Sequence, residues 1–303
     1  MKKVNQISPM YLCIIVVIAI VMSCSHDTNY SALNQEFINI PDPSFEAILI
    51  NKGIDTDSIV NQQILSSDAE EITSLDLSCL EYGAIHNLTG INGFINLKKL
   101  IVAQHEIEEI DLSNNVNLDT LNLAGNELTS INVSRNSKLI FLNLIANELN
   151  SINGLSELTE LKDLDLSWNY FETFNISSES LEVLHISNND LKSLDISAVP
   201  NLRNLLLTSN NLQSLDVFSN RKLETLLVSD NELKTINLTE NQNLTHLYIS
   251  SNSLFNLDVS SIHNLIDLKV DRNENLNCIK ILDGQNIQLI SIENNQELKT
   301  DCN

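Results

Sequence analysis

The chain is poor in positive charge and in the residues that interrupt regular structure. Its 303 residues include only seven glycines and four prolines, so there is little room for flexible linkers, and no second domain is visible. Lysine and arginine together number 17, against 40 aspartates and glutamates. Because a surface with this balance repels nucleic acids and anionic membranes, we expect neither as a partner.

Motifs of the common enzyme classes are also missing. The sequence has no G-x-x-x-x-G-K-[ST] phosphate loop, no G-x-S-x-G elbow, no H-E-x-x-H and no C-x-x-C. Its six histidines are scattered along the chain. We therefore expect no catalytic residue, no metal site and no cofactor.

What the sequence has in abundance is leucine, in lines of the form L-x-x-L-x-L-x-x-N-x-L that recur about every 21 residues. The lines begin at Leu97, Leu118, Leu139, Leu161, Leu181, Leu202, Leu223, Leu244 and Leu265. A fixed period of this length predicts a solenoid. The alternation in L-x-L predicts a strand with one buried face, and stacking of the turns places these strands in a parallel sheet.

The repeated line resembles the leucine-rich repeat family. The resemblance implies an α/β-class solenoid, with a parallel β-sheet on the concave face, short irregular or extended convex segments, and a helical N-terminal cap. We expect the repeat array to span residues 72–275. In that family the asparagine of each line is buried and satisfies backbone groups where the strand ends. The corresponding residues are Asn126, Asn147, Asn169, Asn189, Asn210, Asn231, Asn252 and Asn273, with His105 in the first line.

A second column, fourteen residues after each line start, contains only aspartate and asparagine. Its members are Asp111, Asn132, Asn153, Asn175, Asp195, Asp216, Asn237 and Asp258. Carboxylate and amide oxygens are ligands for calcium, but the same residues also favour turns through local hydrogen bonds. Both interpretations stay open, and the turn is favoured because half of the members carry no charge.

The N-terminus has the features of an export signal in residues 1–23. Two lysines precede an apolar run from Tyr11 to Met22, which is too short to span a bilayer. The sequence Val21-Met-Ser-Cys24 resembles a bacterial lipobox, which implies cleavage before Cys24 and acylation of that cysteine. Acyl chains then anchor the protein to a membrane. Ser25 after the cysteine resembles outer-membrane sorting, so we expect an exported, membrane-anchored lipoprotein at the outer membrane or cell surface.

Residues 24–38 are predicted to be a flexible tether, and residues 39–71 an N-terminal cap. Asp42 suits the N-cap of a helix, Pro43 its first turn and Gly53 the position after its end. Such a helix would cover the open end of the solenoid. The segment from Ile40, followed by E-E-I-T-S-L-D-L-S, resembles the opening of secreted repeat proteins from Bacteroidetes-type bacteria.

The last segment, residues 276–303, is predicted to be a C-terminal cap. An exported chain reaches a compartment that permits disulfides, so Cys278 and Cys302 are the expected pair. Cys13 lies in the signal and Cys24 carries the lipid, which leaves Cys79 as a buried free thiol. Removal of Lys2 and Lys3 leaves 15 basic residues against 40 acidic ones, a net charge of −25.

The concave face is the predicted binding surface. Its polar part contains Asn122, Asn143, Asp163, Asp165 and His185, interrupted by Phe141. Its second part is apolar and aromatic, and a contiguous apolar patch marks an interaction site more often than scattered side chains do. The expected binding residues are Val183, His185, Leu206, Leu227, His246, Tyr248 and Trp168.

The predicted function is non-enzymatic binding of a macromolecule, a host or envelope protein in preference to a glycan. Two alternatives stay open. One is an enzyme or enzyme subunit acting on polysaccharide, with Asp163 and Asp165 as paired carboxylates about 6–7 Å apart and Trp168 as a sugar platform. The other is a structural spacer of the cell envelope.

Overall fold

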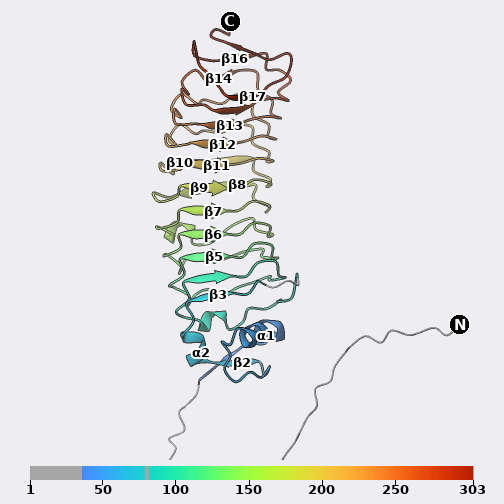
Figure 1. The fold of residues 1–303 in the computed structure, drawn as a ribbon, viewed down its shortest axis with the longest axis vertical. Helices are drawn as coiled ribbons and strands as arrows, with labels where there is room; N and C mark the ends of the chain where they lie inside the picture. The colour runs from blue at the N-terminus through green and yellow to red at the C-terminus, as the bar shows by residue number, and fades with distance from the viewer. Residues whose placement is uncertain (1–35, 79–81, 303) are drawn as a thin grey trace, which may run out of the picture. The chain divides into compact units, whose positions relative to one another are not determined.

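The computed structural model describes residues 36–78 and 82–302, which form a stack of turns (Figure 1). One parallel sheet of eleven strands runs along it in the order β17-β15-β13-β12-β11-β9-β7-β6-β5-β4-β3. The strands are β3 (Ser74–Asp76), β4 (Lys99–Ile101), β5 (Thr120–Asn122), β6 (Phe141–Asn143), β7 (Asp163–Asp165), β9 (Val183–His185), β11 (Asn204–Leu206), β12 (Thr225–Leu227), β13 (His246–Tyr248), β15 (Asp267–Lys269) and β17 (Leu289–Ser291). The predicted solenoid with a long parallel sheet is confirmed.

Each inner strand buries its middle residue and leaves the two flanking ones at least partly accessible, except that Asp267 of β15 is also buried. Leu205 of β11, for example, lies between Leu184 and Leu226 of the neighbouring strands, and none of the three is accessible to solvent. Full burial of a leucine contributes about 1.5–3 kcal/mol. Since a slip of one residue would turn every middle leucine outward, the leucine spacing determines the register.

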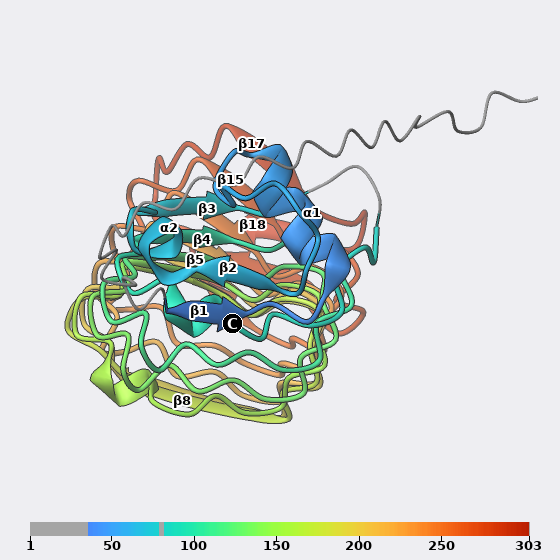
Figure 2. The ribbon, with the colours of Figure 1, turned by 90° about the horizontal axis from the view of Figure 1, so that it is seen from below.

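The opposite face of the stack is extended but less regular. Strand β8 (Thr173–Ser177) pairs with β10 (Ser193–Ala198), and β14 (Leu257–Asp258), β16 (Cys278–Lys280) and β18 (Glu297–Lys299) form a second small sheet. Two short 3₁₀ turns, η1 (Ile91–Gly93) and η2 (Leu155–Glu157), directly precede β4 and β7 in the order of elements. Figure 2 shows β8 on the side away from β3, β4 and β5.

The asparagine column ties each turn to the one before it, as predicted. The side-chain amide of Asn189 donates to the carbonyls of Leu166 and Ile186, and its oxygen accepts from the N–H of Phe171. His105 does the same in the first line. Its Nδ1 accepts from the N–H of Ile85, and its Nε2 lies 3.1 Å from the carbonyl of Leu77, so the Nε2–H tautomer satisfies both groups.

A second buried asparagine column was missed from the sequence. The side-chain amide of Asn136 donates to the carbonyls of Leu112 and Asn115, 3.1 and 3.0 Å away. Equivalent pairs of bonds form in three more turns. The members are Asn115, Asn136, Asn220 and Asn241, each 0% exposed. A visible signal was an asparagine three residues before the first leucine of a line.

The N-terminal end is closed by a small folded cap (Figures 1 and 2). It consists of β1 (Phe37–Asn39) antiparallel to β2 (Gln63–Leu65), with the helices α1 (Pro43–Asn51) and α2 (Ser66–Glu70). Asp42 accepts from the N–H groups of Ser44 and Phe45 and caps α1, as predicted. Because β1 begins at Phe37, residues 37 and 38 of the predicted tether lie in a paired strand.

Two buried carboxylates fasten this cap. The second oxygen of Asp42 accepts from the N–H groups of His86 and Asn87, 44 and 45 residues along the chain. Glu46, which is 0% exposed, accepts from the N–H groups of Asn61, Gln62 and Gln63. Bonds from backbone N–H groups to charged acceptors are stronger than neutral ones. Asp42 therefore holds α1 against the first turn, and Glu46 holds it against the segment that leads into β2.

The C-terminal end contains the predicted disulfide between Cys278 and Cys302, whose Cα atoms are 5.8 Å apart. Strand β17 belongs to the long sheet although it lies inside the segment predicted to be a cap, because Leu289 pairs with Asp267 of β15. The other three cysteines discussed above, Cys13, Cys24 and Cys79, lie outside the described residues.

The Asp/Asn column forms turns, as favoured. In six of its members a side-chain oxygen accepts from the N–H two residues later: Asp111, Asn132, Asp195, Asp216, Asn237 and Asp258. Within the described residues, no group of three or more histidine, cysteine, aspartate or glutamate side chains is arranged to hold a metal ion. Residues 36–78 and 82–302 also contain no helix with the length and apolar character needed to cross a membrane.

Candidate functional site

The first and third residues of the inner strands form two columns, which together we name the sheet face. The third-residue column runs Asp76, Ile101, Asn122, Asn143, Asp165, His185, Leu206, Leu227, Tyr248, Lys269 and Ser291. In it Leu206, Leu227 and Tyr248 are direct neighbours on β11, β12 and β13. The three side chains are half-buried and form a continuous row, which we name the apolar row.

Polar residues of the same column serve the fold. The side-chain oxygens of Asn122, Asn143 and Asp165 accept from the N–H groups of the residues two positions later, at 2.9–3.0 Å. Asp76 does the same with Ser78. Leucine cannot accept a hydrogen bond. The turns that carry the apolar row therefore lack this bond and expose apolar side chains in its place.

Tyr248 is more constrained than the sequence suggested. Its hydroxyl donates to Asp267, with an O–O distance of 2.6 Å, and the Nζ of Lys269 lies 3.8 Å from the centre of its ring. The ammonium group thus lies over the ring that was expected to be free for a partner. The contact was not predicted because it depends on the side-chain conformations of two neighbouring strands.

The other predicted binding residues lie on either side of this row. Val183 is in the first-residue column, between Asp163 and Asn204. His246 is in that column on β13, and its Nδ1 lies 2.9 Å from the hydroxyl of Thr245. His185 adjoins Leu206 in the third-residue column. All three predicted residues border the row.

Asp163, Asp165 and His185 form a small polar cluster next to the row. Nδ1 of His185 is 3.5 Å from Oδ2 of Asp165. Hydrogen bonding to Asp165 raises the pKa of His185, against the effect of burial. Burial raises the pKa of Asp165, but hydrogen bonds from His185 and Ser167 outweigh it and hold that pKa below its usual value.

Asp163 has the opposite shift, because burial raises the pKa of its carboxyl group. Carboxylates with pKa values shifted apart occur in glycosidases. However, Asp165 already accepts hydrogen bonds from its own turn, and neither aspartate lines any of the hollows described below. None of the hollows described below therefore offers these two carboxylates a substrate site.

Trp168 does not lie on the sheet face, contrary to the prediction. It follows β7 in the turn, with a φ of 58°, and its side chain is 60% exposed. The chain leaves the strand direction after Asp165, so Trp168 lies at the edge of the sheet.

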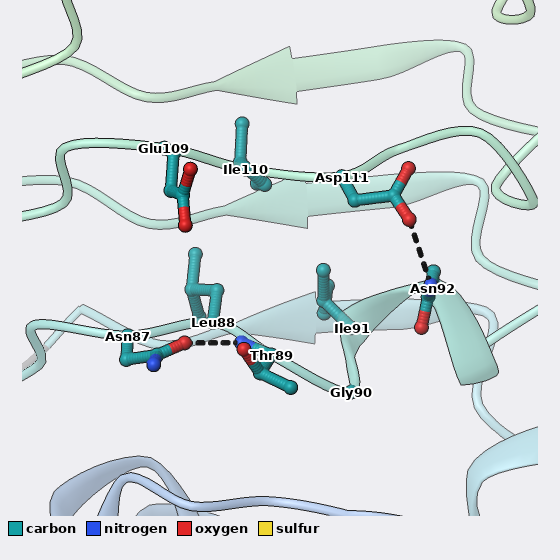
Figure 3. A pocket seen from close by; sticks show the side chains of 9 residues that line it. All are labelled: Asn87, Leu88, Thr89, Gly90, Ile91, Asn92, Glu109, Ile110 and Asp111. Atoms are coloured by element: carbon teal, nitrogen blue, oxygen red, sulfur yellow. Dashed lines mark hydrogen bonds between the residues drawn. The ribbon is translucent and has the colours of Figure 1, made fainter.

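A hollow of 300 Å³ lies between the first two turns of the stack (Figure 3). Its lining residues are Asn87, Leu88, Thr89, Gly90, Ile91, Asn92, Glu109, Ile110 and Asp111. Figure 3 shows the amide of Asn92 directed at Asp111, 2.8 Å away. Hydrogen bonds from Ser113 and Asn92 lower the pKa of Asp111. Its polar groups are thus engaged with one another, and we assign it no ligand.

Comparison with known proteins identifies the fold. No protein-family model matches the chain, and no curated protein matches it in sequence. Among solved structures, the functional domain of InlJ from Listeria monocytogenes is 24% identical, with a TM-score of 0.57 over 87% of this chain and 72% of that one. The LRR protein LIC12759 of Leptospira interrogans is also 24% identical, with a TM-score of 0.53 over 70% of each chain. The fold is a leucine-rich repeat solenoid.

A third similar structure is a leucine-rich repeat protein assembly, the LRIM1/APL1C complex. It is 23% identical, with a TM-score of 0.58, and the match covers 77% of this chain and 46% of that one. At these identities the likeness concerns the fold. The chain therefore resembles bacterial leucine-rich repeat proteins in its turns of about 21 residues, its long parallel sheet and its scarcity of helix.

Proposed function

We propose that the protein is an exported lipoprotein whose leucine-rich repeat solenoid binds another protein through the apolar row. Repeat solenoids generally act as extended binding surfaces rather than as enzymes. One of the similar structures is a complex of such proteins. The observation that carries the proposal is the row itself, in which Leu206, Leu227 and Tyr248 lie side by side on the sheet face.

The two leucines of the row have no role in the fold that would explain their side chains, whereas Tyr248 also bonds to Asp267. The middle leucines of the same strands, such as Leu226, fill the core, while Leu227 points the other way and stays partly accessible. Apolar and aromatic groups at the centre of an interface supply most of its binding energy, and polar groups around them exclude water. His185, Val183 and His246 are suitably placed for that surrounding role.

The experiment is affinity capture with the purified protein from envelope and host-cell extracts, followed by surface binding of the captured protein. We expect Leu227→Asp and Tyr248→Ala each to weaken binding more than tenfold. Replacing both Asp163 and Asp165 with asparagine should alter chiefly the association rate and its salt dependence. The proposal is wrong if the aspartate pair abolishes binding while the two apolar-row variants bind normally.

Attachment of this binding domain to a membrane follows from the lipobox-like sequence at Cys24. We expect Cys24→Ala to release the protein from the membrane fraction or to leave residues 1–23 uncleaved. Fractionation and intact-mass measurement check both results. Unchanged fractionation together with an unchanged mass would exclude acylation at Cys24.

A further inference from the structure

Trp168 is the one tryptophan of the chain. It occupies a position of the repeat with a positive φ, which ordinarily suits other residue types. In each repeat line the residue at this position has a positive φ: Gln104, Gly125, Ala146, Trp168, Asn188, Ser209, Asp230, Ser251 and Arg272. The conformation costs about 1–2 kcal/mol for a residue with a Cβ, and asparagine tolerates it best after glycine. A bulky aromatic side chain is thus the unusual member of the column.

Neither packing nor hydrogen bonding in the fold explains this side chain. The backbone N–H of Trp168 donates to the carbonyl of Ser187, a bond that every residue type except proline could make. Trp168 as a whole residue is 60% exposed. Tyr170, two residues later, is 57% exposed. Two large aromatic side chains therefore stand together at the edge of the sheet.

The two rings line a hollow of 380 Å³ beside β7. Its other lining residues are Asn147, Asn169, Asn188, Asn189, Asp190 and Ser209. Asn147, Asn169 and Asn189 belong to the buried column and use their amides on the backbone. The side chains of Asn188, Asp190 and Ser209, on the two following turns, are therefore the lining groups that can hydrogen-bond to a ligand.

We propose that this hollow binds a neutral glycan, with Trp168 and Tyr170 as stacking rings and Asn188, Asp190 and Ser209 as hydrogen-bonding partners. The C–H face of a pyranose ring is apolar and packs on an aromatic ring, while its hydroxyl groups both donate and accept. Amide, carboxylate and hydroxyl side chains complement those hydroxyls. No lysine or arginine lines the hollow, and the acidic surface disfavours an anionic ligand.

The size and polarity of the hollow favour a glycan over a protein. Ligand sites occupy about 300–1,000 Å³, and this hollow lies in that range. A stable protein interface instead buries about 800 Å² on each partner, with an apolar centre. Here polar side chains border both rings, and the hollow lies at the sheet edge, separate from the apolar row. The glycan site and the protein site use different residues and are tested by different variants.

The single tryptophan provides the measurement. We would titrate the purified protein with cellohexaose, chitohexaose, xylohexaose, maltohexaose, mannohexaose and laminarihexaose. Because Trp168 is the only tryptophan, its emission reports on this hollow alone. We expect at least one of the six to shift the emission maximum to shorter wavelength and to lower the acrylamide quenching constant at least twofold.

Variants are tested by calorimetry with the glycan that binds. Trp168→Asn places a residue suited to positive φ in the column, so it should fold at least as stably and lose binding at least tenfold. Trp168→Phe keeps a ring and should retain part of the affinity. Tyr170→Ala should weaken binding at least threefold. Leu227→Asp is the matched control, since it changes the apolar row and should leave the glycan titration unchanged.

Three results would each overturn the proposal. The first is that none of the six glycans alters the emission or the quenching. The second is glycan binding that survives Trp168→Asn. The third is a Trp168→Asn variant that loses a captured protein partner while glycan binding is absent, which would make the two rings a protein contact. The first two results do not bear on the apolar row, whose test uses Leu227 and Tyr248. The third would extend the protein contact beyond that row.

Discussion

The two parts of the sheet face use the same strand position for different purposes. Toward the N-terminus, the third residue of the strand is Asn122, Asn143 or Asp165, and its side chain closes the following turn with a hydrogen bond. In the apolar row the same position holds Leu206 or Leu227, which cannot form that bond. A structural role thus explains the polar side chains, and we propose that binding explains the two leucines.

This contrast also bears on the enzymatic alternative. Asp163 and Asp165 are close together, as paired carboxylates would be, but Asp165 is one of the turn-closing residues and is also bonded to His185. A residue that the fold requires needs no catalytic explanation. We therefore assign Asp165 to the fold, and we propose that the apolar row contacts the partner.

The largest expected effect separates two adjacent residues of β12. Leu226 is inaccessible in the core and Leu227 lies on the sheet face. Leu226→Asp should destabilise the protein by more than about 4 kcal/mol, because it buries an unpaired carboxylate. Leu227→Asp should change stability by no more than about 0.5 kcal/mol. Chemical denaturation compares them, and similar losses for both would mean that Leu227 belongs to the core.

Substitutions in the buried asparagine column should cost the same stability beneath the polar part of the sheet face as beneath the apolar row. Asn147 and Asn231 form equivalent bonds to the preceding turn. Asn147→Ala and Asn231→Ala should each cost about 1–3 kcal/mol, since each leaves backbone groups unpaired. Asn150→Ala, on an exposed residue, is the control and should cost less than about 0.5 kcal/mol. A large difference between the two buried sites would show that the parts differ in more than their surface.

Exchange of residues between the two parts should have a smaller effect. Asn143→Leu removes the bond to the N–H of Ile145 and should cost about 0.5–1.5 kcal/mol. The reverse change, Leu206→Asn, introduces an acceptor where one is missing and should not destabilise the protein. Thermal unfolding of the two variants provides the test. If Asn143→Leu has no effect on the melting temperature, the hydrogen bond is not what maintains asparagine there.

The smallest effect is the pH dependence of stability that arises from Asp165 and His185, which lie next to the apolar row. The raised pKa of His185 contributes stability below its unfolded value of 6.5, and this is lost as pH rises through the folded pKa. The lowered pKa of Asp165 contributes stability above its unfolded value of 3.8, and this is lost as pH falls through the folded pKa. NMR titration should give a folded pKa above 6.5 for His185 that decreases in Asp165→Asn. An unchanged pKa in that variant would contradict the pairing.

Much of this face could be predicted from the sequence, because the leucine spacing fixes which residues share a strand position. The apolar row and the disulfide follow from that spacing and from the cysteines at the C-terminus. The positive-φ column could not be found, since only Gly125 among its members carries the usual glycine signal. Nor could the contact of Lys269 with Tyr248, which depends on side-chain conformation rather than on register.

The most direct test of the account is to add the same charge to each part of the face. Leu227→Asp and Asn122→Asp both introduce one carboxylate in the third-residue column, and Asn122→Asp keeps the oxygen that closes its turn. Dissociation constants of the captured protein partner would be measured for both variants. We predict at least a tenfold increase for Leu227→Asp and less than a threefold change for Asn122→Asp. Equal weakening by both variants, or a larger effect at Asn122, would contradict the assignment of binding to the apolar row.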